Sequence, residues 1–363
     1  MIHIFIGTKA QFIKMAPIMQ DLNNRGIRYN LIDAGQHAGL TGDLIQQFGL
    51  YRPDVFIRQE RTNINSVIQA LSWTTKHSAK LILQGKLIFR EVFRGKKGIC
   101  LIHGDTLTTL ISLFFAKRCK IPVAHVEAGL RSHRLFNPFP EEIIRLLAMR
   151  FSDLLFAPSG WAYDNLLRMG YGGKSVNIGA NTGQDAVSYA ISQQKFGQRP
   201  TQAYVVVTIH RVETIYSRSR LMMVVKLLEH IAHEFRVLFV LHEPTYNQLM
   251  RFGLAARIKG IEGVEISRLL PYMEFVNLLH GAHYVITDGG SIQEECYYLN
   301  KPCMLLRTKT ERLEGLDENA FLVGFDQKRI KQFFGILPKL KRKNLKENLK
   351  PSAAIVDYIS QWA

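Results

Sequence analysis

The chain has few cysteines and no long apolar run, and these two features argue against a disulfide-rich protein and a membrane-spanning one. Its 363 residues include four cysteines, Cys100, Cys119, Cys296 and Cys303, without CxxC spacing. This count argues against a disulfide framework, so we expect free thiols, most of them buried in or beside strands. No apolar run approaches the roughly 20 residues that span a bilayer. The chain also begins with a strand pattern rather than a signal core, and we expect a cytoplasmic protein.

Several signatures of cofactor and metal chemistry are missing as well. Neither CxxC nor HExxH spacing is present for zinc, and no GxSxG elbow is present for a hydrolase serine. The first turn, residues 7–14, has one glycine where the dinucleotide fingerprint needs three, and no P-loop motif occurs. We therefore expect neither a metal site nor a bound cofactor.

The charge balance is strongly basic, with 47 Lys and Arg against 30 Asp and Glu, a formal net charge of +17. Such a balance invites a nucleic-acid interpretation. Between Lys328 and Lys350, however, nine basic residues face one acid. This concentration favours a solvated basic arm, or peripheral contact of segment 328–350 with an anionic membrane, over a nucleic-acid groove. Residues 64–95 also look largely helical, with a basic surface that includes Lys86, Arg90 and Arg94.

Short apolar runs alternate with helical patterns along the whole chain. Strand patterns occur at residues 2–6, 29–34, 99–102, 122–126, 154–157 and 175–178, and the series starts afresh at 204–208, 237–241, 264–266, 284–287 and 304–307. The alternation predicts an α/β protein with two Rossmann-like, doubly wound domains facing one another across a cleft. We place the first domain at 1–168 and the second at 169–345. Residues 346–363 then hold a C-terminal helix that we expect to pack back on the first domain.

Acidic residues follow two of the predicted strands. Asp105 comes just after the strand at 99–102, and Glu127 directly follows the strand at 122–126. A third acidic pair, Glu141–Glu142, follows two prolines. Because ligands bind at the carboxyl ends of parallel strands, we expect Asp105, Glu127 and Glu141 to line one cleft.

Two turns are candidates for binding an anion. Lys9 and Lys14 flank the beginning of the first helix, whose N-terminus suits a diphosphate; solvent-facing lysines are the alternative. The turn at 288–291, DGGS, offers backbone N–H groups to a phosphate, and Ser291 can cap the following helix; an ordinary strand-to-helix turn is the alternative. Glu295, one turn on, can accept hydrogen bonds from sugar hydroxyls.

One histidine has a position suited to acid–base chemistry. His210 ends an apolar strand and precedes Arg211, and this pair can neutralise or protonate a leaving phosphate. A structural histidine is the alternative. His103 and His125 lie in or at the ends of core strands, where we expect satisfied internal histidines.

Six motifs in a fixed order carry a family resemblance. They are HGDT (103–106), HVEAGLR (125–131), PFPEE (138–142), TIHR (208–211), DGGSIQEE (288–295) and RTKTER (307–312). With these motifs the chain resembles the UDP-N-acetylglucosamine 2-epimerase family from Ile4 to about Val323.

The resemblance implies two Rossmann-like domains in the GT-B arrangement with a UDP-sugar between them, and a homodimer that serves the biosynthesis of surface polysaccharide. It implies removal of the C2 proton of the sugar with anti elimination of UDP, to a 2-acetamidoglucal that water or returning UDP then attacks. By motif, the catalytic residues are Asp105, Glu127, Glu141 and His210. The substrate-binding residues it implies are Lys9, Lys14, Arg145, Arg211, Phe275, Gly289, Gly290, Ser291, Glu295 and Arg312.

The departures from the family pattern fall on the phosphate side. The family turn GTRPEAIK is here GTKAQFIK, so Lys9 replaces an arginine and Gln11 replaces a glutamate. The usual DSGG is DGGS, which moves the hydroxyl to Ser291. Two other functions therefore stay open beside the epimerase: a GT-B glycosyltransferase acting on a membrane or glycan acceptor, and a nucleotide-sugar-binding protein without catalysis.

Overall fold

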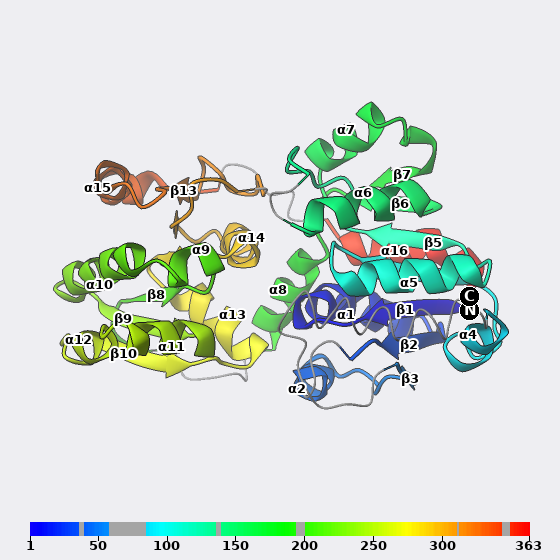
Figure 1. Ribbon diagram of the computed structural model, residues 1–363, viewed down its shortest axis with the longest axis horizontal. Coiled ribbons are helices and arrows are strands. Elements are labelled where there is room, and N and C mark those ends of the chain that lie inside the picture. The colour runs from blue at the N-terminus through cyan, green and yellow to red at the C-terminus, as the bar shows by residue number, and fades with distance from the viewer. Residues whose placement is uncertain (36–39, 58–84, 136–138, 194–199, 311, 343–348) are drawn as a thin grey trace. The chain divides into compact units, whose positions relative to one another are not determined.

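The computed structural model describes residues 1–35, 40–57, 85–135, 139–193, 200–310, 312–342 and 349–363. The chain divides into two compact units (Figure 1): Met1–Ala186 with Asn348–Ala363, and Val187–Glu347. The division expected after residue 168 falls later, at residue 186. The reason is that the strand at Ser175–Asn177 pairs with the first sheet, so the chain has not yet left the first unit there.

The first unit is built on a seven-stranded sheet in the order β3-β2-β1-β4-β5-β6-β7, with parallel pairing throughout. Strands of such sheets are buried on both faces, which explains their nearly unbroken apolar sequences. All five residues of β1, for example, are buried. The strands are β1 (Ile2–Ile6), β2 (Tyr29–Asp33), β3 (Val55–Phe56), β4 (Ile99–His103), β5 (Val123–Val126), β6 (Leu154–Ala157) and β7 (Ser175–Asn177).

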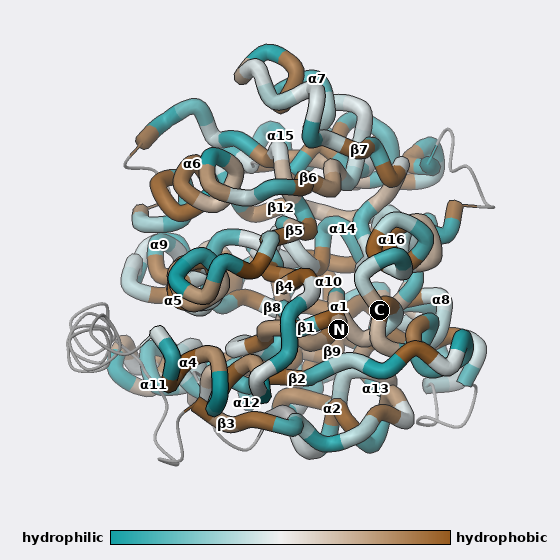
Figure 2. Tube along the Cα trace, turned by 90° about the vertical axis from the view of Figure 1, so that its right-hand side faces the viewer, coloured by the Kyte–Doolittle hydropathy of each residue, from teal (hydrophilic) through white to brown (hydrophobic). Residues whose placement is uncertain are grey.

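Helices cover both faces of this sheet. Helix α1 contacts α2 and α16, and helix α5 contacts α4 and α6. Figure 2 shows hydrophobic residues in β1 and β4, between these helices. The helices are α1 (Lys9–Asn24), α2 (Leu40–Phe48), α4 (Gly85–Glu91), α5 (Leu107–Arg118), α6 (Glu141–Phe151), α7 (Gly160–Arg168) and α16 (Pro351–Ile359), with short 3₁₀ turns η1 (Gly172–Lys174) and η3 (Ser360–Trp362). Helix α8 (Gly183–Ser192) contains the division between the units, after Ala186.

The second unit repeats the plan with six parallel strands in the order β10-β9-β8-β11-β12-β13. Its strands are β8 (Tyr204–Thr208), β9 (Arg236–Leu241), β10 (Val264–Arg268), β11 (Val285–Thr287), β12 (Cys303–Leu305) and β13 (Ala320–Leu322). Its helices are α9 (Val212–Ile215), α10 (Arg218–Ala232), α11 (Glu243–Arg251), α12 (Ala255–Lys259), α13 (Tyr272–Gly281), α14 (Gly290–Tyr298) and α15 (Gln327–Ile336), with the 3₁₀ turn η2 (Leu337–Lys339).

Both strand orders reverse direction once, between β1 and β4 in the first unit and between β8 and β11 in the second. In doubly wound sheets, ligands bind beyond the carboxyl ends of the strands at this switch point. The prediction of two Rossmann-like, doubly wound α/β sheets is confirmed. The fold therefore directs attention to the turns after β1 and β4, and after β8 and β11.

The C-terminal helix α16 belongs to the first unit. Its buried side chains include Ile355, Val356 and Ile359. The backbone N–H of Ser352 donates to Asp185 at 2.8 Å, and Arg25 pairs with Asp357 at 2.5 Å. The last residues of the chain thus close the first unit rather than the second.

The basic segment expected from Lys328 onward is not an arm in its described part. Residues 327–336 form α15, capped by the Asp326 carboxylate and packed into the second unit through Ile330 and Phe333. Farther on, the Arg342 guanidinium donates to the carbonyls of Tyr297 and Tyr298 at the end of α14. The apolar stripe of α15 explains the difference, because it gives this charged run a buried face.

Membrane-spanning helices and metal-binding clusters are both absent from the described residues. No helix in the described ranges is long and apolar enough to cross a membrane. The same ranges contain no group of three or more His, Cys, Asp or Glu side chains that could hold a metal ion. The four cysteines are free, and Cys100, Cys296 and Cys303 are buried, as predicted.

Candidate active site

Two neighbouring turns at the switch point of the first unit are tied together by Gln11. Its side-chain N–H₂ donates to the His103 carbonyl and to Thr106 Oγ1, both at 2.8 Å, and its oxygen accepts from the Gly7 backbone N–H at 3.0 Å. With Thr8 it also forms a capping box that starts α1. A glutamate at this position would have no N–H to donate. Gln11 therefore couples the turn after β1 to the Asp105 turn through N–H groups that a glutamate lacks.

Glu127 lies directly after β5 and is held by two donors. Its Oε1 accepts from Lys14 Nζ at 2.5 Å and from Asn181 Nδ2 at 2.6 Å, and all three side chains are buried. The other carboxylate oxygen lies 3.7 Å from His103 Nε2. The backbone of Glu127 has a φ of +68°, a left-handed conformation that is uncommon for a residue with a Cβ. Such strain is typical of residues whose side-chain direction matters.

Asp105, after β4, is paired with a different cation. Its Oδ2 lies 2.5 Å from Arg145 Nη2, and the Arg145 side chain is buried in α6. Arg145 also reaches Glu142 Oε2 at 3.4 Å. The structure therefore places Arg145, which was expected to bind substrate, next to the predicted catalytic carboxylate.

Glu141 and Glu142 are neighbours in the first turn of α6 with opposite environments. Glu142 is fully buried, accepting from Arg131 Nε at 2.6 Å and from the Ser132 N–H at 3.0 Å. Glu141 is half-buried, and its Oε2 has no hydrogen-bond partner among the described residues. Of the two carboxylates, Glu141 is the one with an oxygen to which no described residue donates a hydrogen bond, and that oxygen is itself buried.

The two histidines of these strands differ. His125 donates through Nε2–H to the Gly104 carbonyl, 2.8 Å away, and burial lowers its pKa to about 4. It is the internal histidine that was predicted. His103, by contrast, borders Glu127, a neighbour that its position in the sequence did not reveal.

The second unit joins its two switch-point turns through Asp288. This fully buried carboxylate accepts from the backbone N–H groups of His210 at 3.0 Å and Arg211 at 3.1 Å. The His210 ring stacks on His242 with centroids 4.7 Å apart. Burial lowers the pKa of His210, and Asp288 opposes that shift. His210 is thus a neutral imidazole near pH 7, at the carboxyl end of β8.

The turn before α14 is built around glycine. A Cβ on Gly289 would lie 2.6 Å from His210 Cε1, so only glycine leaves room for that ring. Helix α14 begins at Gly290 with Gly289 as its N-cap, and no side chain caps it. The expectation that Ser291 caps this helix is wrong: Ser291 lies inside the first turn and is exposed. The N–H groups at this helix start are consequently left for a ligand or for water.

The remaining predicted binding residues of the second unit have different surroundings. Arg312 pairs with the buried Glu294, and Gln293 donates to the Arg312 and Glu314 carbonyls at 3.0 and 2.9 Å, so this loop is anchored on α14. Glu295 is half-buried. Phe275 on α13 packs against the apolar cluster beside β11 and β12. Arg211 donates to Glu213 at 2.8 Å.

Sequence reasoning missed Gln11, Asn181 and Asp288 as organising residues. Asn181 stands after β7, and polar residues after strand ends are the signal that could have identified it. Asp288 was considered only as part of its turn. Lys9 is half-buried in the first turn of α1, as expected for a residue at that helix start.

The chain matches known proteins over nearly its whole length. The family model described as UDP-N-acetylglucosamine 2-epimerase matches residues 20–351. A UDP-N-acetylglucosamine 2-epimerase of Methanococcus maripaludis is 32% identical over 343 residues, 91% of this chain and 89% of that protein. A UDP-2,3-diacetamido-2,3-dideoxy-D-glucuronate 2-epimerase of Pseudomonas aeruginosa is 29% identical, over 85% of this chain and 84% of that protein.

A solved structure agrees with these matches. The Methanocaldococcus jannaschii UDP-GlcNAc 2-epimerase, in complex with UDP-GlcNAc and UDP, superposes with a TM-score of 0.83 at 29% identity, covering 99% of both chains. The family match, the relatives and the fold agree with the order of the six motifs. This chain belongs to the UDP-N-acetylglucosamine 2-epimerase family.

Proposed function

We propose that this protein is a UDP-N-acetylglucosamine 2-epimerase that interconverts UDP-GlcNAc and its C2 epimer, or acts on a closely related UDP-HexNAc. The observation that supports this most directly is the set of carboxylates in the first unit. Asp105 and Glu127 follow adjacent strands and are each paired with a buried cation, while the Glu141 carboxylate has an unpartnered oxygen among the described residues.

The chemistry begins at the C2–H bond of the sugar. A carboxylate takes the C2 proton, the C1–C2 double bond forms, and the C1–O bond breaks with its electron pair passing to the UDP oxygen. We assign the proton transfer to Glu141, because an ion-paired carboxylate is a weaker base than an unpaired one. Asp105 and Glu127 complete the acid–base set. Return of UDP to C1 and of a proton to the other face of C2 gives the epimer.

The departing diphosphate needs hydrogen-bond donors and positive charge. In the second unit these are the N–H groups at the start of α14, with Gly289, Gly290 and Ser291, and the side chains of His210 and Arg211. A neutral His210 can donate a hydrogen bond to the phosphate, or take up a proton as the phosphate approaches. This suits a group that meets charge developing during the reaction. Phe275, Glu295 and Arg312 are the proposed contacts for uridine and ribose, and Lys9 and Lys14 for phosphate in the first unit.

The decisive experiment uses UDP-GlcNAc in D₂O and follows the sugar by NMR. We expect deuterium at C2 and a new UDP-sugar with inverted C2; free sugar and UDP in its place would show that water traps the intermediate. The proposal is contradicted if no deuterium appears at C2 and no UDP is released, both with UDP-GlcNAc and with the diacetamido relative's sugar. Consumption of UDP-sugar only on addition of a lipid or glycan acceptor would instead support the glycosyltransferase.

Three further predictions concern the oligomeric state, the membrane contact and the pathway of the protein. We propose that the protein works as a homodimer, as the family resemblance implies. Peripheral contact of segment 328–350 with an anionic membrane also stays a prediction, as does a role in polysaccharide biosynthesis. Size-exclusion chromatography with light scattering tests the first, and a monomer at micromolar concentration would contradict it.

A further inference from the structure

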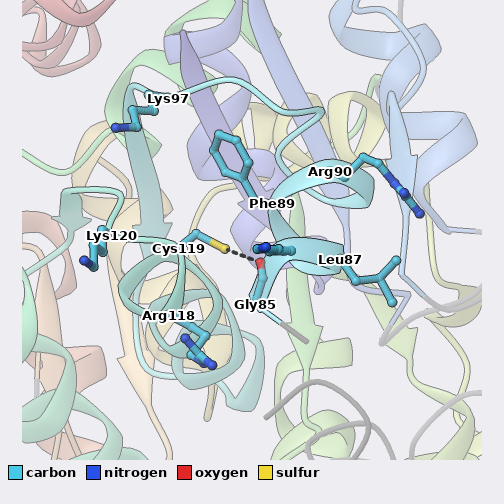
Figure 3. Close-up of a pocket in the computed structure, with 9 residues that line it drawn as sticks. Gly85, Leu87, Phe89, Arg90, Lys97, Arg118, Cys119 and Lys120 are labelled. Carbon is cyan, nitrogen blue, oxygen red and sulfur yellow. Dashed lines mark hydrogen bonds between the residues drawn. The ribbon is translucent and has the colours of Figure 1, made fainter. Parts of the chain in front are cut away.

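An open basic cavity of about 790 Å³ lies beside α4 and the end of α5 in the first unit (Figure 3). It is separate from every residue assigned to the reaction. The described residues that line it are Gly85, Lys86, Leu87, Phe89, Arg90, Lys97, Arg118, Cys119 and Lys120.

Five of these side chains are cationic, and none of the described lining residues is acidic. Arg90 has one acidic neighbour, Glu91, at 2.8 Å, and both are exposed. Cys119 brings no negative charge, because burial raises the pKa of its thiol to about 11. From Lys86 to Lys120 the sequence has eight Lys and Arg against two acidic residues. The described lining of the cavity therefore gathers five cationic side chains and contributes no acidic one.

The frame of the cavity is fixed by contacts between its two helices. Cys119 Sγ donates to the Gly85 carbonyl at 3.6 Å. The Arg118 guanidinium lies over Gly85, where an added Cβ would meet Nη1 at 3.1 Å. Phe89 packs against the apolar core beneath. Figure 3 shows Lys97 and Lys120 on one side of the cavity, with Arg118 below them. These contacts join α4 to the end of α5 beneath the charged side chains, which are exposed.

The cavity lies at the opposite end of the strands from the carboxylates. Lys97 precedes β4 and Lys120 precedes β5, whereas Asp105 and Glu127 follow these strands. A strand of five residues spans roughly 16 Å. A ligand in the cavity is consequently not part of the substrate site described above. A second cavity of about 540 Å³ lies at the amino ends of β1 and β2, and its lining includes four cationic residues, Arg28, Arg52, Arg94 and Lys96, and one acidic residue, Asp54.

We propose that the α4–α5 cavity is a binding site for a phosphate-bearing anion. Several cations around one cavity, without acids in its described lining, suit a ligand that carries more than one negative charge. A phospholipid headgroup and a soluble polyphosphate share this chemistry. The site is independent of the proposed epimerase activity, so either can fail alone.

The test compares two double variants of the full chain that remove the same charge. Lys97→Glu with Lys120→Glu changes the cavity, and Lys226→Glu with Lys259→Glu changes two exposed lysines of the second unit, on α10 and α12. One arm titrates tripolyphosphate by calorimetry. The other measures sedimentation with phosphatidylglycerol vesicles, with phosphatidylcholine vesicles as the blank. Circular dichroism and epimerase activity, expected to be unchanged in both variants, report on folding.

We expect the cavity variant to lose one tripolyphosphate site, or to bind phosphatidylglycerol vesicles at least about thirtyfold more weakly, while the second-unit variant binds like the wild type. Lys97→Arg with Lys120→Arg keeps the charge and should keep the binding. A loss confined to vesicles identifies a lipid headgroup, and a loss confined to tripolyphosphate identifies a soluble anion. If the cavity variant and the second-unit variant behave alike in both arms, the proposal is overturned.

Discussion

Glu141 and Glu142 are neighbours on one helix, yet we expect a chemical role for the first and a structural role for the second. Burial alone would raise the pKa of Glu142, but hydrogen bonds from Arg131 and Ser132 outweigh it and lower that pKa. Glu142 is thereby fixed as a buried anion that braces Arg131 and Arg145. Glu141 lacks such partners among the described residues, and its buried Oε2 is left there without a hydrogen bond.

These environments predict opposite effects for two identical substitutions. Glu141→Gln should lower kcat by about 10²- to 10⁴-fold, because a proton-transfer group is lost, with little change in Tm. Glu142→Gln should lower the free energy of unfolding by about 3 kcal/mol, because it leaves buried guanidinium charge uncompensated. Steady-state kinetics and urea unfolding of both variants measure the contrast. Equal loss of kcat without loss of stability in Glu142→Gln would contradict the division of roles.

Sequence position identified the carboxylates but not what holds them. Asp105 and Glu127 could be predicted because they directly follow apolar strands, and strand ends of a parallel sheet share one edge. The partners of Glu127 could not, since Lys14 lies 113 residues and Asn181 lies 54 residues away in the chain. Pairing over such separations depends on strand order, which local patterns do not specify.

At the scale of elements, strands were easier to predict than helix starts. The strands at 154–157 and 204–208 have the predicted bounds, because fully buried parallel strands are unbroken apolar runs. Helix α14 begins at Gly290 rather than at Ile292, where the apolar pattern begins. Its N-cap is a glycine without a side-chain acceptor, so no capping pattern indicates the true start.

Strands β1 and β5 each carry a buried histidine, which makes the first sheet sensitive to acid. Burial lowers the pKa of His3 and of His125 to about 4, from 6.5. Below pH 6.5 the unfolded chain takes up protons that the folded chain accepts only near pH 4. The free energy of unfolding should therefore fall as the pH drops from 6.5 to 4, by up to roughly 3 kcal/mol for each histidine.

Urea unfolding at pH 7.5, 6 and 5 measures this slope. His125→Gln keeps a hydrogen bond to the Gly104 carbonyl and removes the titrating group, so we expect a shallower slope between pH 6.5 and 4. His230→Gln, at the end of α10, is the matched control, because it leaves both buried histidines in place. An unchanged slope in His125→Gln would exclude His125 as a source of acid sensitivity.

At the scale of the whole molecule, the chain forms two similar sheets, and both of its termini belong to the first unit. The repeat of the strand order was predictable because apolar strands and helices alternate twice along the sequence. The exact division was not, since β7 and the turn after it belong to the first unit although helix α7 already looks like a domain end. The return of the last helix could only be expected from its apolar face, and the structure shows what that face covers.

Helix α16 makes the two units depend differently on the end of the chain. Ile355 is fully buried in the first unit, and Ile258 on α12 is fully buried in the second. Ile355→Ala should cost about 2 to 5 kcal/mol through lost burial and the cavity it leaves. Because α16 contacts α1, amide exchange should accelerate in α1 and β1 but not in β8 or β9.

Ile258→Ala removes the same side chain from the other unit and should give the reverse pattern, with faster exchange in α10, α12 and β10. Hydrogen exchange measured by mass spectrometry resolves both units in one experiment. If Ile355→Ala accelerates exchange equally in β1 and β8, the two units unfold as one cooperative body. In that case α16 stabilises the whole chain, and the division into separately stable units does not hold.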